Sequence, residues 1–135
     1  MDLKRIIPPA LIAGVLVSII TEFVWGACCV NPLTGLLAAS ILIALNRQAV
    51  MRLEEYVSCG ALAGLSNGLT SMLVSLAFVL IGQPLEPGVH YTNTATWVAW
   101  AFAIVVTTFL WTLAGAVGGA VVGAAWKVIR KEQLP

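Results

Sequence analysis

The sequence predicts an all-α membrane protein with a single domain over residues 1–135, built as a bundle of four transmembrane helices. Hydrophobic residues make up 60% of the chain and charged residues only 10%, with a mean hydropathy of +0.98, which leaves too little polar surface to cover a soluble globule. Four apolar segments are roughly long enough to cross a hydrocarbon core of about 30 Å, which takes about 20 helical residues. They lie at about 6–28, 32–50, 58–81 and 97–126.

The first segment follows Lys4 and Arg5, a start that secretory signals share. A cleaved signal peptide is therefore the alternative, with Gly26-Ala27-Cys28 as its processing site. We favour an uncleaved span, because Trp25 is bulky where a processing site needs a small or aliphatic residue and Glu22 interrupts the apolar run.

The second segment is the weakest of the four. Its apolar run extends only from Leu33 to Leu45, and Pro32 suits the first turn of a helix, where its missing N–H is no loss. The stretch from Asn46 to Ser58 places apolar side chains on one helical face. We expect it to form a short helix on the cytoplasmic surface, an extension of the second span, or a docking face for a partner.

The third and fourth segments share a regular spacing of glycine, at Gly60, Gly64 and Gly68 in one and at Gly115, Gly119 and Gly123 in the other. A soluble helix would lose stability at each position, whereas in a membrane such a stripe is a smooth face that another backbone can approach closely. We expect the two spans to pack along these stripes as an antiparallel hairpin. The alternative is that one stripe binds a neighbouring protomer. Gly14 and Gly35 give the first two spans similar faces.

The basic residues predict the orientation. All seven lie before the first span, between the second and third, or after the fourth: Lys4, Arg5, Arg47, Arg52, Lys127, Arg130 and Lys131. The other two connections, one of them the outer loop at 82–96, contain no Lys or Arg. The positive-inside rule therefore places both termini of a multi-pass protein on the cytoplasmic side of the cell membrane.

Glu22 is the one carboxylate inside a predicted span, and it continues a stripe of small residues formed by Ala10, Gly14 and Ser18. This face contacts protein rather than lipid, and at 1.5 Å per residue Glu22 lies roughly 24 Å from the cytoplasmic boundary. The same estimate brings polar groups of the other spans to or near this level, namely Asn31, Thr34, Ser71, Ser75, Thr108 and Thr112. Together they form a candidate polar intramembrane site.

Two interpretations of this site stay open. In the functional one, Glu22 exchanges a proton or binds a cation within a small polar cavity. In the structural one, its carboxyl group is hydrogen-bonded and fixes the register of the bundle. The polar stripe of the third span, which includes Asn67 and Ser71, then supplies hydrogen bonds between helices, whereas Thr107, Thr108 and Thr112 can bond the carbonyl four residues earlier.

Several classes of function find no support in the sequence. A net charge of +1 and the lack of a basic, aromatic-rich run argue against a nucleic-acid partner. There is no Ser/His/Asp or Cys/His arrangement, phosphate-binding loop, metal-ligand cluster or haem motif, so we expect no enzymatic activity, metal or cofactor. Cys28, Cys29 and Cys59 fit neither a disulfide framework nor the spacing of a zinc site, and His90 is expected to be an exposed loop residue.

An internal repeat is suggested by two offsets. A shift of 50 residues places Ala10–Gly14 on Gly60–Gly64, and a shift of 80 places Gly35 on Gly115. These matches are those of two repeated helical hairpins.

The glycine-rich segments PLTGLLAAS, CGALAGLSNGL and LAGAVGGAVVGAAWKVIR resemble those of small four-span prokaryotic, often archaeal, membrane proteins of unknown function. The resemblance implies no activity. Size and the lone glutamate of the first span also resemble small multidrug resistance transporters, but Glu22 lies away from the membrane centre and the charge bias fixes one orientation. We expect a structural or accessory subunit of a membrane assembly, with lipid and a second copy or other membrane subunits as partners. The alternative is a small ion- or proton-coupled transporter or channel that uses Glu22.

Overall fold

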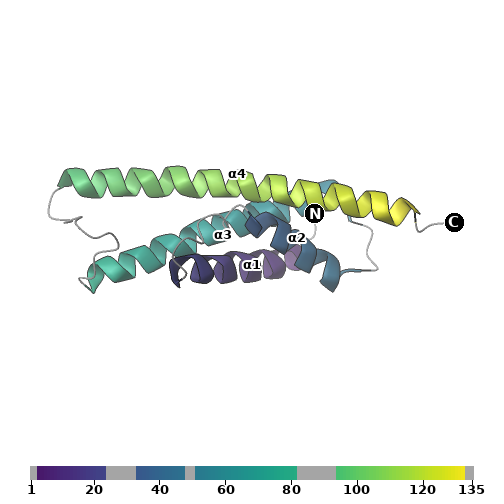
Figure 1. Ribbon diagram of the computed structural model, residues 1–135, viewed down its shortest axis with the longest axis horizontal. Coiled ribbons are helices and arrows are strands. Elements are labelled where there is room, and N and C mark those ends of the chain that lie inside the picture. The colour runs from purple at the N-terminus through teal and green to yellow at the C-terminus, as the bar shows by residue number, and fades with distance from the viewer. Residues whose placement is uncertain (1–2, 24–32, 48–50, 82–93, 133–135) are drawn as a thin grey trace.

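The computed structural model describes residues 3–23, 33–47, 51–81 and 94–132. Within these ranges the chain forms four α-helices and no strand (Figure 1): α1 Leu3–Phe23, α2 Thr34–Leu45, α3 Leu53–Leu80 and α4 Thr94–Glu132. Three of them, α1, α3 and α4, are long and apolar enough to cross a membrane. The all-α class is therefore confirmed for the described ranges, as is the presence of helices able to cross a membrane.

The second predicted span differs from the structure. It was expected over 32–50, but α2 has only 12 residues, Thr34–Leu45, and rises about 18 Å, which is less than a hydrocarbon core of about 30 Å. The helix ends where the apolar run ends. Asn46 closes it, since its backbone N–H donates to the carbonyls of Leu42 and Ile43, and its side-chain Nδ2 donates to Leu42 O at 3.1 Å.

The third helix begins earlier than predicted. Leu53–Ser58, expected in part as a separate surface helix, is the first part of α3. The Glu55 carboxylate accepts the backbone N–H of Arg52 at 2.9 Å, and Glu54 and Glu55 place negative charge in the first turn, where the helix dipole favours it. These interactions explain why the helix extends beyond the apolar segment.

The outer helices also differ from their predicted limits. α1 covers Leu3–Phe23 instead of 6–28, and residues 24–28 lie outside the described part of the chain. α4 covers Thr94–Glu132, longer than the predicted 97–126. Of the predicted outer loop, residues 94–96 are helical and 82–93 lie outside the described residues.

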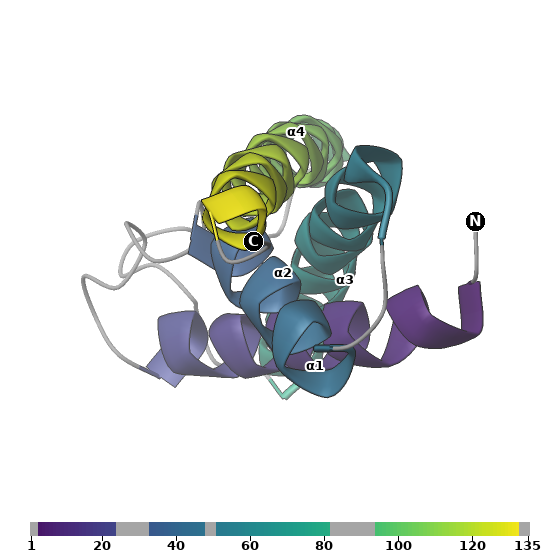
Figure 2. The ribbon, with the colours of Figure 1, turned by 90° about the vertical axis from the view of Figure 1, so that its right-hand side faces the viewer.

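α2 and α3 each contact all three other helices, and the longer α3 makes the more extensive contacts, while α1 and α4 make no contact with each other within the described ranges. α1 and α3 run in the same direction along the bundle. The Cys59 thiol donates to Ile6 O at 3.7 Å near the start of the contact, and Ser18 meets Ser71 at its other end. α4 runs antiparallel to α3, and α2 runs in the direction of α4 (Figure 1). Figure 2, which looks along α3 and α4, shows α1 running across them at a large inclination.

The core consists mainly of small side chains. Five buried alanines are shared among α1, α2 and α3: Ala10, Ala13, Ala38, Ala39 and Ala63. Large apolar residues such as Leu73 and Phe102 are instead exposed on the outside of the bundle. This distribution suits lipid, where close approach of backbones stabilises helix packing and bulky side chains face the acyl chains.

Candidate functional site

Four of the buried polar residues form two hydrogen-bonded pairs, and each pair joins a different helix to α3. The first pair is Ser18 of α1 and Ser71 of α3, whose hydroxyl oxygens lie 3.1 Å apart in the buried interface. It follows from the small-residue stripe of α1, which brings that helix close enough to α3 for two short side chains to meet. Thr21, three residues further along α1, donates to the backbone carbonyls of Val17 and Ser18.

The second pair joins α2 to the middle of α3. Thr34 begins α2, and the Asn67 Nδ2 atom donates to its Oγ1 atom at 3.5 Å. Both side chains are fully buried, at 0% exposure. The pair therefore fixes the start of the short α2 helix against α3 without contact with solvent or lipid.

Two residues of the predicted polar site cannot be placed in this arrangement. Glu22 lies in the last turn of α1, but its side chain is outside the described part of the structure, and Asn31 is outside it altogether. Thr34 and Ser71 are buried and belong to the two pairs, while Ser75 is half-buried.

The threonines of α4 lie beside the glycines of α3 and bond within their own helix. Thr108 packs on Gly68, and Thr112 lies against Gly64 and donates to Thr108 O at 2.8 Å. Thr107 likewise donates to Ala103 O, so bonding to the carbonyl four residues earlier is confirmed for Thr107 and Thr112.

The predicted convergence at one level does not hold for Ser75 and Thr112. Thr112 lies opposite Gly64, which is eleven residues, or about 16 Å of helix, from Ser75. Hydropathy changes too gradually along the two apolar segments to predict how far one helix is shifted along the other. Close contacts between the α3 and α4 backbones set it, and they shift α4 by about two turns from the predicted position.

The closest contacts in the bundle surround Gly115. A methyl carbon placed on Gly115 would overlap the carbonyl oxygen of Gly60 in α3, and one placed on Gly35 of α2 would lie 2.6 Å from the Gly115 Cα atom. Because a second helix approaches on each side, no side chain fits at this point. Gly115 therefore marks where three helix backbones meet.

The neighbouring glycines extend this contact in both directions. Gly119 lies against the Tyr56 carbonyl and Gly60, and Gly123 faces the Tyr56 ring, with a hypothetical methyl 2.7 Å from its Cγ atom. At the other end Gly64 lies against Trp111 and Thr112. The two glycine stripes are thus in contact within one chain, although most glycines of one helix meet larger residues of the other. In α1, Gly14 packs on Ala63 and Ser66 in the same manner.

The sequence analysis missed one residue of the close backbone contacts, Gly118, and left one residue, Asn67, out of the polar site. Gly118 lies outside the four-residue stripe, yet a methyl carbon on it would lie 2.9 Å from the Leu36 nitrogen of α2. The adjacent pair Gly118-Gly119 was the available signal, since consecutive glycines expose two neighbouring faces of a helix. Asn67 was expected to form hydrogen bonds between helices but was not assigned to the polar site, although it occupies the centre of the interior polar arrangement.

The chemistry of the site is that of neutral hydroxyl and amide groups. The buried polar residues that the structure describes are Ser18, Thr34, Ser66, Asn67 and Ser71. None of these side chains changes charge near neutral pH. Across the described ranges no group of three or more His, Cys, Asp or Glu residues could hold a metal ion. The arrangement is suited to hydrogen bonding between helices.

The chain matches no protein-family model, no curated protein and no solved structure. Its class is therefore defined by the fold alone, as an all-helical protein with three helices able to cross a membrane.

Proposed function

We propose that the protein is a compact structural or accessory subunit of a membrane assembly. The observation that carries this proposal is the pairing of interior polar groups, Ser18 with Ser71 and Thr34 with Asn67, across closely packed helices. Carriers of protons or ions commonly place ionisable side chains inside the membrane, where they bind and release the transported species. The described buried polar groups are neutral, and their hydrogen bonds join helices to one another.

α4 offers the surface for such an assembly. Only 11% of an 18-residue apolar stretch within Trp97–Arg130 of α4 is buried, compared with 39% of the corresponding stretch within Leu3–Thr21 of α1. Large apolar side chains repeat along its exposed side at spacings of three and four residues, at Val98, Phe102, Val105 and Phe109. A second copy or another membrane subunit can pack against this long stripe, which the other described helices leave uncovered.

We also infer that the chain crosses the membrane four times, with both termini on the cytoplasmic side of the cell membrane. α1 and α3 run in the same direction, so the chain returns across the bundle between them, and α2 runs in the returning direction (Figure 1). The Arg130 guanidinium donates to Arg47 O at 3.5 Å, so two of the basic segments lie at the same end. This grouping supports the positive-inside orientation.

The sequence offsets of 50 and 80 residues lead us to propose that the bundle consists of two repeated hairpins, α1 with α2 and α3 with α4. The directions of the helices are compatible with this proposal, because α1 runs with α3 and α2 runs with α4 (Figure 1). The helices of the two hairpins nevertheless differ in length, with 21 and 12 residues in the first and 28 and 39 in the second.

A flux assay in reconstituted vesicles tests the structural role against transport. We expect ion and proton flux through vesicles containing the protein to equal that of empty vesicles, with or without a membrane potential. Glu22→Gln is the informative variant. Flux that depends on pH or voltage, and that Glu22→Gln abolishes while helicity is retained, would establish the transporter and overturn the proposal.

Photo-crosslinking in native membranes tests the assembly. A photoreactive amino acid at Phe109, on the exposed stripe of α4, is expected to form a protein adduct of fixed mass. The matched control is Ile20, an exposed apolar position on α1 with 47% exposure. If Phe109 gives only lipid adducts, as Ile20 is expected to do, α4 is not an assembly surface.

A further inference from the structure

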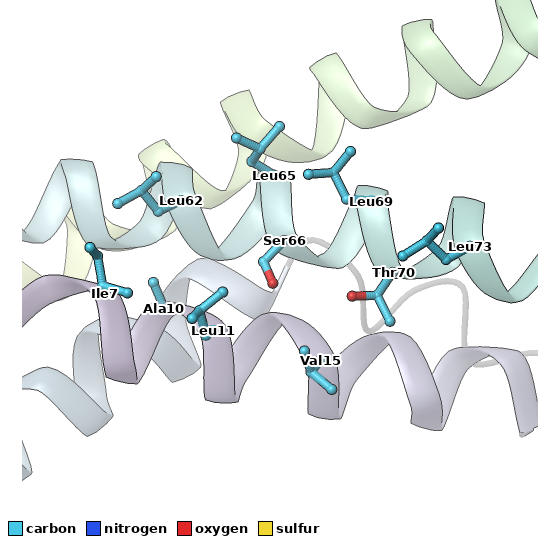
Figure 3. A pocket seen from close by; sticks show the side chains of 10 residues that line it. All are labelled: Ile7, Ala10, Leu11, Val15, Leu62, Leu65, Ser66, Leu69, Thr70 and Leu73. Atoms are coloured by element: carbon cyan, nitrogen blue, oxygen red, sulfur yellow. The ribbon is translucent and has the colours of Figure 1, made fainter.

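A groove of about 290 Å³ opens between α1 and α3 (Figure 3). Its walls are apolar side chains of both helices, including Ile7, Leu11 and Val15 from α1 and Leu62, Leu69 and Leu73 from α3. The hydroxyls of Ser66 and Thr70 lie along its floor, and Figure 3 shows them between the two rows of apolar side chains. The groove is thus hydrophobic along its length.

The groove is narrow compared with a protein helix. A helix with its side chains is about 10 Å across, so a segment as long as the distance from Ile7 to Val15, about 12 Å, occupies on the order of 1000 Å³. The groove holds about 290 Å³. A helix of a second copy could therefore insert only single side chains into it, whereas a hydrocarbon chain can follow it along its length.

The length of the groove corresponds to one membrane leaflet. Lys4, Ile7, Leu11 and Val15 follow one another at spacings of three and four residues and therefore lie on one face of α1. On α3, which follows the long axis of the bundle, the lining residues extend from Leu62 to Leu73, a rise of about 16 Å, and half of a hydrocarbon core is about 15 Å. An acyl chain that follows this face places its headgroup near Lys4.

The charge at this end of the groove is positive on α1, where Lys4 is exposed and Arg5 follows it. On α3, Glu55 lies on the same helical face as Leu62 and Leu69, but its carboxylate accepts the Arg52 backbone N–H at 2.9 Å. Lys side chains at helix ends extend toward the membrane surface, and basic clusters between spanning helices bind anionic lipid headgroups.

We propose that the groove between α1 and α3 holds one acyl chain of an anionic phospholipid, with the headgroup phosphate bound by Lys4. The groove accounts for the chain, and the lysine accounts for the charge of the headgroup. This site is separate from the exposed stripe of α4 and does not depend on the role in an assembly.

Native mass spectrometry of the full chain tests the proposal. The protein is released from micelles that contain either phosphatidylglycerol or phosphatidylcholine with the same acyl chains. We expect one tightly retained phosphatidylglycerol. Val15→Trp fills the groove and is expected to weaken its binding at least about tenfold, because several buried methylenes lose their contacts. Lys4→Gln is expected to lower the preference for phosphatidylglycerol over phosphatidylcholine about fivefold, because the choline ammonium already offsets much of the attraction between Lys4 and the phosphate of phosphatidylcholine.

The matched control is Val106→Trp on α4, because Val106 is 39% exposed and Val15 36% exposed, and only Val15 lines the groove. Leu69→Trp, on the opposite wall, is a second blocking variant in case one substitution disturbs folding, which circular dichroism detects. The proposal is overturned if both blocking variants retain phosphatidylglycerol like the wild type. It is also overturned if they convert a dimer to a monomer without affecting lipid binding, since a second copy would then occupy the groove.

Discussion

At the scale of single residues, the glycines of α4 allow helix backbones to approach more closely than any side chain would permit. Gly115 would weaken a soluble helix, but here it lets the α2 and α3 backbones approach from two sides. The spacing of glycines predicted that α3 and α4 have close-packing faces. It could not predict which atoms meet, because a stripe of identical residues allows several registers one turn apart.

A large side chain at Gly119 is expected to disrupt the contact between α3 and α4. Gly119→Leu would force the helix away from the Tyr56 carbonyl and Gly60, with a loss of about 1–3 kcal/mol or more in the free energy of unfolding. Titration of helicity with sodium dodecyl sulfate in mixed micelles measures this loss. Val121→Leu, at a position that is 57% exposed, should leave the midpoint unchanged. Equal stability of both variants would show that Gly119 is not in a close contact.

The hydrogen bond between Ser18 and Ser71 is expected to contribute modestly to stability. A double-mutant cycle of Ser18→Ala and Ser71→Ala should give a coupling free energy of about 0.6 kcal/mol, a typical value for polar pairs between membrane helices. Ser40→Ala is a suitable control, because Ser40 is exposed and bonds only Leu36 O of its own helix. Additive effects of the two substitutions would mean that the hydroxyls do not interact.

At the scale of helices, hydropathy predicts the existence of a helix more accurately than it predicts where the helix ends or how it aligns with its neighbours. The apolar run Leu33–Leu45 matches α2 closely, since the polar residues Asn46 and Arg47 interrupt the apolar pattern there. The start of α3 was missed because Glu54 and Glu55 lower hydropathy while they stabilise the first turn. The prediction that Ser75 and Thr112 lie at the same level was wrong for a similar reason, since composition does not determine how far one helix is shifted along another.

Tyr56 is expected to hold the first turns of α3 against the end of α4. Its side chain is 1% exposed and packs on Gly123, so Tyr56→Ala should leave a cavity and cost about 3 kcal/mol or more in unfolding free energy. Phe102→Ala removes an aromatic ring that is 70% exposed on α4. The control should change stability by less than about 0.5 kcal/mol in the same detergent titration. A comparable loss in both variants would contradict the burial of Tyr56.

At the scale of the whole molecule, composition was sufficient to predict the class, whereas the polar site depended on tertiary contacts. A chain with so few charged residues has too little polar surface to cover a soluble globule, which is why the membrane class could be predicted. The pairing of Thr34 with Asn67 could not be predicted, because it requires a short α2 that begins beside the middle of α3.

The proposed topology predicts the accessibility of single cysteines. In a background without native cysteines, residues replaced at Lys4, Arg47 and Lys127 should all react with an impermeant maleimide added from the cytoplasmic side. Leu80, at the far end of α3, should react only from the opposite side. Labelling of Lys4→Cys and Arg47→Cys from opposite sides would show that the chain does not return between α1 and α3.

The free energy of unfolding of Gly115→Ala tests the central claim most directly, because the sign of the change decides between two accounts. If Gly115 were an ordinary helical position, alanine would stabilise the protein by up to about 1 kcal/mol. Because the α2 and α3 backbones both contact it, we predict that the added methyl group destabilises the protein by about 1–3 kcal/mol. An unchanged or increased stability would contradict the meeting of three helix backbones at this residue.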